Sequence, residues 1–111
     1  MIKQLKNIIR KNKILFSFAK KIIFIKSIPL KDFFNFKKLW LFKKVYPYTM
    51  VGHARLSNVY ELANLIEKNK IAGVFAECGV WRGGCVAVMA FVAQKFGSNR
   101  KIWLFDSFEG L

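Results

Sequence analysis

The residues best suited to bind a ligand form a glycine-bearing stretch that runs from Ala76 to Gly84 and contains Gly79, Gly83 and Gly84. Glycine lets a chain leave a strand in conformations that a Cβ opposes, and it lets backbone approach a ligand or a neighbouring strand closely. The free N–H groups that open a following helix favour a carboxylate or a phosphate. The stretch therefore predicts a ligand-binding turn, with an ordinary tight loop as the alternative.

Apolar runs on both sides of the glycines indicate which elements would position them. Ile71 to Ala76 has the length of a strand, and Cys85 to Phe96 has the length of a helix that stops at Gly97. The glycines then occupy a strand-to-helix turn, which is where a doubly wound sheet binds nucleotide-like ligands. Their spacing, G-x-x-x-G-G, differs from the dinucleotide fingerprint G-x-G-x-x-G, which argues against a nicotinamide-dependent oxidoreductase.

An acidic residue follows a second apolar run, Lys101 to Phe105. Asp106 lies 22 residues after Gly84 and precedes Ser107. In Rossmann-type sites an acid about 20 residues beyond the glycines accepts hydrogen bonds from the ribose hydroxyls. Asp and Ser are also common turn-capping residues, so Asp106 could simply cap the next turn. With the glycine turn at this distance upstream, we favour the ribose role.

Four strings of residues, in order and spacing, resemble the macrocin O-methyltransferase (TylF-type) family. They are Tyr48-Thr49-Met50-Val51-Gly52, Arg55-Leu56, Glu77-Cys78-Gly79-Val80-Trp81-Arg82-Gly83-Gly84 and Asp106-Ser107-Phe108-Glu109-Gly110-Leu111. The resemblance covers about residues 46–111, and residues 1–45 match no motif. It implies a class I S-adenosylmethionine-dependent O-methyltransferase that acts on a sugar hydroxyl of a glycosylated natural product or polysaccharide.

The resemblance also implies a set of cofactor-binding residues. Thr49 and Met50 would lie over the methionine end, the glycines would shape the pocket, Glu77 would orient the turn or reach the cofactor's amino group, and Asp106 with Ser107 would hold the ribose. The full set is Thr49, Met50, Glu77, Cys78, Gly79, Trp81, Gly83, Gly84, Asp106 and Ser107. In the family the catalytic base and the acids that bind Mg²⁺ come from later parts of the sequence, so the resemblance assigns neither to this chain.

The predicted fold class is α/β, the N-terminal portion of a Rossmann-like class I methyltransferase fold with two parallel strands. The two strands show no polar alternation, which predicts that helices cover both faces of the sheet. A helix is expected over Arg55 to Asn69. Its buried face would hold Leu56, Val59, Leu62, Ala63 and Ile66, whereas Glu61, Asn64, Glu67 and Lys68 would mostly face water. Because Leu111 follows the second strand, we expect an N-terminal fragment of a longer enzyme.

Residues 1–44 carry most of the positive charge. They hold 13 of the 20 lysines and arginines but one acid, Asp32, in a chain of net charge +14. Ile28-Pro29 should break this segment into two helical pieces, the second at Phe33 to Phe42. The apolar face of the first would comprise Leu5, Ile8, Ile9, Phe16, Ala19, Ile22 and Ile23. We therefore divide the chain into a basic, mainly helical extension, 1–45, and an incomplete cofactor-binding domain, 46–111.

Four interpretations of the extension stay open. It could pack on the enzyme with its lysines in solvent, lie on an anionic membrane surface, bind nucleic acid, or form a disordered or misassigned start. The absence of a nucleic-acid motif argues against specific nucleic-acid binding. Its longest charge-free run, Ile14 to Ala19, is six residues long, too short for a membrane span or a signal peptide. The sequence thus predicts a cytoplasmic protein, with peripheral membrane contact and homo-oligomerisation left open.

The remaining candidate side chains suggest no further chemistry. Cys78 and Cys85 do not form a C-x-x-C pair, and His53 is the single histidine, so no zinc or redox motif can be drawn. We expect both cysteines to be small packing residues and His53 to be structural. The non-enzymatic alternative is a basic membrane-surface or interaction module that carries a remnant methyltransferase motif. A further alternative is another Rossmann-like nucleotide-binding enzyme.

Overall fold

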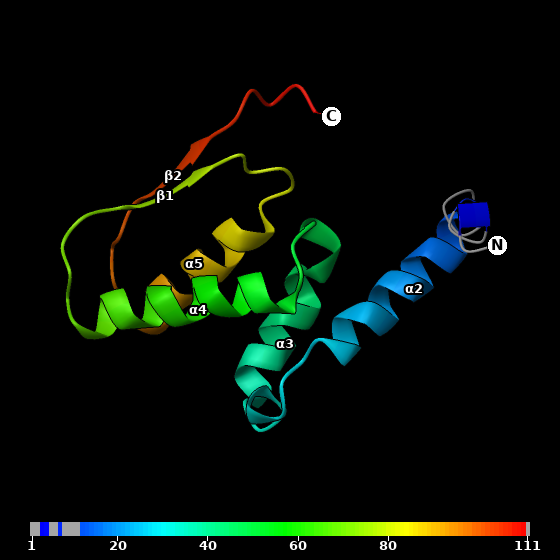
Figure 1. The fold of residues 1–111 in the computed structure, drawn as a ribbon. Helices are drawn as coiled ribbons and strands as arrows, with labels where there is room; N and C mark the ends of the chain where they lie inside the picture. Colours follow the sequence, from blue (N-terminus) through cyan, green and yellow to red (C-terminus); the bar gives the residue numbers. More distant parts are fainter. Residues whose placement is uncertain (1–2, 5–6, 8–11, 111) are drawn as a thin grey trace.

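A computed structural model describes residues 3–4, 7 and 12–110 of the chain. A sheet lies beside a group of helices, and one helix near the N-terminus extends away from that group (Figure 1). The elements are α2 (Lys13–Lys26), η1 (Leu30–Asp32), α3 (Phe36–Val45), η2 (Tyr46–Tyr48), α4 (His53–Lys68), β1 (Phe75–Cys78), α5 (Gly84–Lys95) and β2 (Ile102–Phe105). The predicted positions Leu5, Ile8, Ile9 and Leu111 lie outside the described residues.

Local signals set the ends of the N-terminal helices. The side chain of Asn12 accepts hydrogen bonds from the N–H groups of Ile14 and Leu15, which caps the start of α2. Asn35 caps α3 in the same way, through the N–H of Lys38. Between the two helices Pro29 has an extended backbone, so the predicted break at Ile28-Pro29 is confirmed.

The two strands are parallel neighbours, as predicted, with Ala76 opposite Trp103 and Cys78 opposite Phe105. The first strand begins at Phe75 and not at Ile71, so the start predicted from the sequence was wrong. The reason is that the Arg100 guanidinium donates to the carbonyl oxygens of Ile71 and Gly73, at 2.7 and 2.9 Å, so these oxygens make no ladder bonds. The strand also ends at Cys78 and not at Ala76, so Glu77 and Cys78 belong to the strand and not to the turn.

Helices α3, α4 and α5 form the core together with β1. Helix α5 contacts both α4 and α3. The buried cluster consists of Leu41, Phe42, Val45, Leu56, Tyr60, Ala63, Phe75, Val88, Val92 and Ala93. In the described part of the chain the helices lie on one side of the sheet (Figure 1), and Trp103 and Phe105 of β2 are 52% and 48% exposed. The expectation that both faces are covered is therefore not met there. The arrangement is compatible with part of a Rossmann-like methyltransferase fold.

The buried stripe of α4 differs in part from the predicted one. The helix starts at His53, two residues before the expected Arg55. Leu56 and Ala63 are buried as predicted, but Leu62 is 49% exposed and Glu67 is buried. Glu67 can be buried because it forms an ion pair with Arg100, with 2.6 Å between Oε1 and Nε. An ion pair between two residues that are distant in sequence thus takes the place of an apolar contact on the buried face of α4.

The basic N-terminal segment is held to the rest of the protein by a buried lysine. Lys38 is fully buried, and its ammonium donates to Asp32, Ser57 and Glu61 at 2.9, 2.7 and 2.7 Å. The Asp32 carboxylate also bonds Nε2 of His53, at 2.8 Å. The view that all lysines of this segment face solvent is therefore wrong for Lys38. The division of the chain at residue 45 stays a prediction, and α3 contributes Leu41, Phe42 and Val45 to the core.

Candidate functional site

The glycine stretch forms the turn between β1 and α5. Gly79 and Gly83 both have a φ of +82°, the left-handed region that favours glycine. Gly79 N–H donates to the carbonyl oxygen of Phe105 at 2.8 Å, so the turn begins beside the end of the neighbouring strand. Trp81, at the tip, also has a positive φ, +49°, and is 40% exposed. The predicted strand-to-helix turn is confirmed.

The Asp106 carboxylate connects this turn to the end of β2. Its Oδ2 accepts hydrogen bonds from the N–H groups of Val80 and Trp81, at 2.6 and 3.2 Å. Its Oδ1 accepts from the N–H of Phe108 at 3.1 Å. These backbone donors, with Phe108 the strongest, lower the pKa of Asp106 below 3.8. Asp106 therefore caps the turn that follows it and also fixes the turn after β1, and it is ionised at neutral pH.

The segment before α4 packs against the start of α5. A Cβ on Gly84 would lie 2.5 Å from Cβ of Thr49 and 2.7 Å from the carbonyl oxygen of Tyr48. Glycine at position 84 thus permits a close approach by another part of the chain. Thr49 is 4% exposed, whereas Met50 beside it is 59% exposed. Both residues were predicted to lie over the methionine end of the cofactor, but Thr49 is in the packed interior and Met50 is at the surface.

Glu77 lies in β1 beside the first turn of α5. Its Oε2 is buried and has no hydrogen-bond partner among the described residues. Burial raises the pKa of Glu77 above 4.5, an effect that the Cys85 thiol and the Val86 N–H oppose only in part. Burial also raises the pKa of Cys85, with the Glu77 charge as the next cause, whereas Thr49 acts to lower it. Thr49, Glu77 and Cys85 therefore form one polar cluster.

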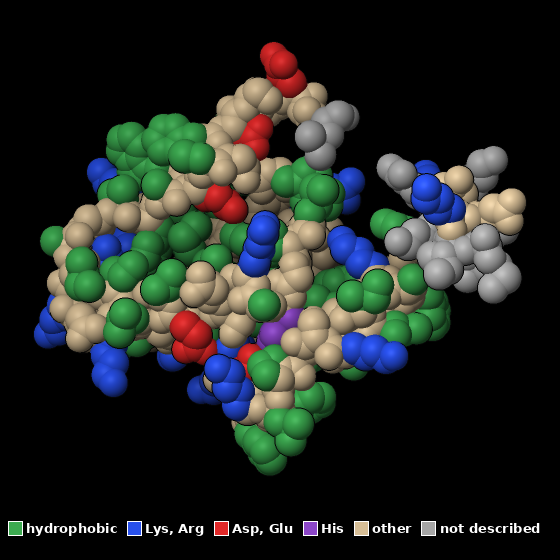
Figure 2. All heavy atoms as spheres, viewed as in Figure 1, with side chains coloured by type: hydrophobic (Ala, Val, Ile, Leu, Met, Phe, Trp, Pro, Cys, Tyr) green, Lys and Arg blue, Asp and Glu red, His purple; other side chains and the backbone are tan. Residues whose placement is uncertain are grey.

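Eight of the ten predicted site residues divide into two groups around the turn. Thr49, Glu77 and Gly84 gather at the start of α5, with Cys85 as a member that the sequence analysis treated as packing. Gly79, Trp81, Gly83, Asp106 and Ser107 gather where the strands end; Ser107 Oγ lies 3.5 Å from Oδ1 of Asp106. Cys78, at the end of β1, is an exposed free thiol, so the expected packing role is wrong for this residue. Acidic side chains lie near the ends of the two strands in Figure 2.

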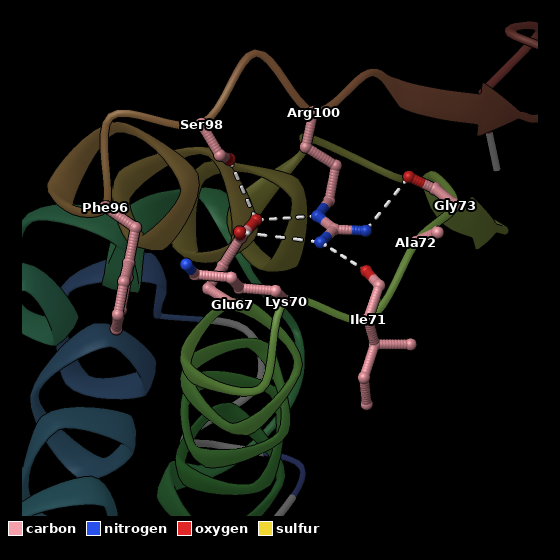
Figure 3. A pocket seen from close by; sticks show the side chains of 8 residues that line it. All are labelled: Glu67, Lys70, Ile71, Ala72, Gly73, Phe96, Ser98 and Arg100. Carbon is pink, nitrogen blue, oxygen red and sulfur yellow. Dashed lines mark hydrogen bonds and ion pairs between the residues drawn. The ribbon is translucent and has the colours of Figure 1, made fainter.

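A separate pocket of about 410 Å³ lies beyond the C-terminal end of α4 (Figure 3). The side chains of Glu67 and Arg100 pair in it, and Ser98 Oγ donates to Glu67 Oε1 at 2.9 Å. All of these polar groups bond one another or the backbone at Ile71 and Gly73. We therefore interpret this pocket as the junction that closes the loop before β1 and not as a ligand site.

The described residues also bear on what a metal site and a membrane span require. Within residues 3–4, 7 and 12–110, no group of three or more His, Cys, Asp or Glu side chains could hold a metal ion. Over the same residues, no helix is long and apolar enough to cross a bilayer.

A parallel βαβ unit with a glycine turn and an acid at the end of the second strand is the arrangement of a Rossmann-like nucleotide-binding half-site. Residues 40–111 match the family described as macrocin-O-methyltransferase (TylF). The chain belongs to this family, which confirms the relationship inferred from its motifs.

Three curated relatives are similar to the chain. The first is 8-demethyl-8-(2,3-dimethoxy-alpha-L-rhamnosyl)-tetracenomycin-C 4'-O-methyltransferase of Streptomyces olivaceus, 38% identical over 65 residues, or 58% of this chain and 25% of the relative. Demethyldecarbamoylnovobiocin O-methyltransferase of Streptomyces niveus is 34% identical over 65 residues, which are again 58% of this chain and 25% of the relative. Mycinamicin III 3''-O-methyltransferase of Micromonospora griseorubida is 33% identical over 57% of the chain and 25% of the relative. No solved structure is significantly similar to the chain.

The matched part of the chain thus corresponds to about a quarter of each of these relatives. All three are O-methyltransferases by name. Membership of the family implies S-adenosylmethionine as the methyl donor.

Proposed function

We propose that this chain supplies the S-adenosylmethionine-binding part of an O-methyltransferase that acts on a sugar hydroxyl of a glycosylated natural product or polysaccharide. One observation carries the proposal: the Asp106 carboxylate bonds the turn after β1, at 2.6 Å to Val80 N, so the glycine turn and the acid form one cradle. The names of the relatives, each an O-methyltransferase, support the reaction type. The acceptor class rests on the same relatives.

The unpartnered oxygen of Glu77 fits the amino group at the methionine end of the cofactor. A buried carboxylate oxygen without a donor is costly, and an ammonium supplies both charge and hydrogen bonds. Oε2 of Glu77 is such an oxygen. Thr49 lies in the same cluster, and Met50 is exposed next to it, where it could cover the bound methionine chain.

The ribose end would lie at the other side of the turn. Asp106 is ionised and exposed, so its carboxylate can accept from ribose hydroxyls beside the backbone bonds it already makes. Gly79, Gly83 and the exposed face of Trp81 would line the approach, with Cys78 and Ser107 at the two strand ends. Bound S-adenosylmethionine would supply an electrophilic methyl group on its sulfonium. The contribution of these residues is to hold and orient it, because alignment lowers the barrier.

Other parts of the enzyme would complete the site. The catalytic base, and any Mg²⁺ ligands, would come from sequence beyond these residues, as the family resemblance implies. On this proposal the protein's partners are a small-molecule or glycan substrate, and its place of action is the cytoplasm.

The test is binding of S-adenosylmethionine by the full-length protein, measured by titration calorimetry. We expect the wild type to bind, and we expect Asp106→Ala to weaken binding at least about tenfold, since hydrogen bonds to a charged group are worth about 1.5–3 kcal/mol. Asp106→Asn retains an acceptor for the turn and controls for loss of the turn itself. Glu109→Gln, an exposed acid three residues later, should bind as the wild type does. Failure of the wild type to bind would overturn the proposal, and unchanged binding by Asp106→Ala would remove Asp106 from the site.

A further inference from the structure

Helix α2 carries an apolar stripe that is exposed along the helix. At 3.6 residues per turn, five large side chains fall within an arc of about 100°. They are Ile14, Leu15, Phe18, Ile22 and Ile25, which are 76%, 50%, 64%, 50% and 59% exposed. We call these five residues the α2 stripe. Exposed apolar surface that is contiguous, and not scattered, marks an interaction site.

The opposite side of α2 holds the helix to the protein. Phe24 packs against Tyr46 with 4.9 Å between ring centroids, and Lys20 Nζ donates to the carbonyl oxygen of Thr49 at 3.2 Å. On a helical projection Lys20 lies about 170° and Phe24 about 130° from the middle of the α2 stripe. Of the apolar face expected from the sequence, Phe16, Ile22 and Ile23 are exposed, and α2 buries no residue. The stripe is therefore exposed on a helix that contacts the rest of the protein through Lys20 and Phe24.

The position of α2 in the sequence separates it from the family match. The family match begins at residue 40, so all of Lys13–Lys26 precedes it. The stripe therefore lies outside the part of the chain that matches the family.

The charges around the stripe have one sign. Residues 12–44 contain nine lysines and a single acid, Asp32. That acid is 5% exposed and paired with the buried Lys38, so the remaining charges of this segment are eight lysines at or near the surface. Lys21 and Lys26 flank the stripe on its two sides. Figure 2 shows the mixture of blue and green side chains along this part of the molecule.

A groove beside the stripe has the same character. It has a volume of about 570 Å³ between α2 and α3, with an apolar floor that includes Phe24, Ile25 and Ile28. Lys21 and Lys43 stand at its rim. This groove matches the chemistry of a phospholipid, because its apolar floor suits the acyl chains and its cationic rim suits the anionic headgroup.

We propose that α2 binds the surface of an anionic lipid bilayer, with the α2 stripe inserted at the level of the headgroups and Lys21 and Lys26 in contact with lipid phosphates. A helix that lies in the interface needs an apolar face and flanking lysines, and it does not need the length of a membrane span. Nucleic acid is the weaker candidate, because binding to its backbone uses the lysines but offers no place for five large aliphatic and aromatic side chains.

The experiment is co-sedimentation of the protein with vesicles of phosphatidylcholine, prepared with and without phosphatidylglycerol. We expect binding to the anionic vesicles that weakens with added salt, and little binding to the neutral ones. Phe18→Ser with Ile22→Ser should lower the partition constant about tenfold or more, because the apolar insertion is lost. The double variant Lys21→Ala with Lys26→Ala should lower the partition constant about fivefold for each lysine removed from the membrane surface.

Matched controls use residues of the same kind on another face. Leu62→Ser with Leu65→Ser changes two leucines that are 49% and 53% exposed on α4, and Lys68→Ala with Lys101→Ala removes two exposed lysines. Both controls should bind vesicles as the wild type does. Circular dichroism verifies that each variant is folded.

Three outcomes would overturn the proposal. The first is equal binding to neutral and anionic vesicles, or none to either. The second is that the stripe variants leave vesicle binding unchanged but convert a dimer to a monomer in sedimentation velocity, which would assign the stripe to a second copy of the chain. The third is that the lysine variants lose binding to single-stranded or duplex DNA while vesicle binding is absent.

Discussion

The ammonium of Lys38 lies 2.9 Å from the carboxylate of Asp32, and both side chains are buried. Burial alone would lower the pKa of Lys38, but its hydrogen bonds to Glu61 and Asp32 outweigh this and raise the pKa above 10.5. Burial would likewise raise the pKa of Asp32, yet the bonds from His53 and Lys38 lower it below 3.8. The pair therefore stays charged, and it links η1 and α3 to α4.

We predict that Lys38→Met destabilises the protein by about 3 kcal/mol, because removal of one partner leaves the other charge buried without it. The measurement is the free energy of unfolding in urea. Lys37→Met is the matched control, since Lys37 is exposed on the same helix, and it should lie within about 0.5 kcal/mol of the wild type. Equal stability of the two variants would show that the buried pair does not hold the N-terminal segment in place.

A second ion pair predicts a dependence of stability on pH. The hydrogen bond from Arg100 is the main cause that lowers the pKa of Glu67 below 4.5. Because the folded-state pKa is depressed, the ionised Glu67 stabilises the fold above about pH 4.5, and this stabilisation is lost as pH falls through the lower folded-state pKa. Glu67→Gln should therefore be less stable than the wild type at neutral pH and equal to it in acid. A constant difference in unfolding free energy across this range would contradict the prediction.

Gly84 predicts a steric effect at the start of α5. A Cβ at this position would lie 2.5 Å from a side-chain atom of Thr49 and 2.7 Å from the backbone of Tyr48, and backbone cannot move aside cheaply. We expect Gly84→Ala to cost about 1–3 kcal/mol, as overpacking does, and to weaken S-adenosylmethionine binding by displacing Thr49 and Met50. Gly52→Ala is the control, because its Cβ would meet nothing within 4 Å. Thermal unfolding compares the two, and equal melting temperatures would show that the segment adapts.

Much of the α/β part could be predicted because its signals are local. The strand-to-helix turn that holds the glycines, the helix that ends before Gly97 and the parallel pairing of two apolar strands follow from residue types and spacing. The start of β1 could not be predicted in this way. Ile71 to Ala76 is apolar, but Arg100, which is distant in sequence, donates hydrogen bonds to the carbonyl oxygens of Ile71 and Gly73.

The errors at charged residues have the same cause. Glu67 and Lys38 were expected in solvent because charge usually stays there, but each has a partner that is distant in sequence, Arg100 at 33 residues and Glu61 at 23. No periodicity encodes such a pairing. In the candidate site, the sequence indicated that Asp106 and the glycine turn belong together. It did not indicate the direct bonds of Asp106 to Val80 and Trp81, nor the place of Cys85 beside Glu77.

Glu77 gives a prediction that separates cofactor binding from folding. Because burial raises its folded-state pKa above 4.5, the ionised form opposes folding, and the stability present at low pH falls as pH rises through that pKa. Glu77→Gln removes the charge but keeps an acceptor for the Val86 N–H. In the absence of cofactor, this variant should be at least as stable as the wild type at neutral pH, by thermal unfolding. Its affinity for S-adenosylmethionine should nevertheless fall about tenfold or more, since a charge-assisted bond to the ammonium is lost.

The pH dependence of binding sharpens this test. Affinity of the wild type should rise with pH as Glu77 ionises, whereas affinity of Glu77→Gln should be flat over the same range. S-adenosylhomocysteine, which retains the amino group but lacks the sulfonium methyl, should show the same contrast, because the contact is to the amino end. Calorimetry at a series of pH values measures both. A wild-type affinity that does not change with pH, or a variant that binds as tightly as the wild type, would place the amino group elsewhere.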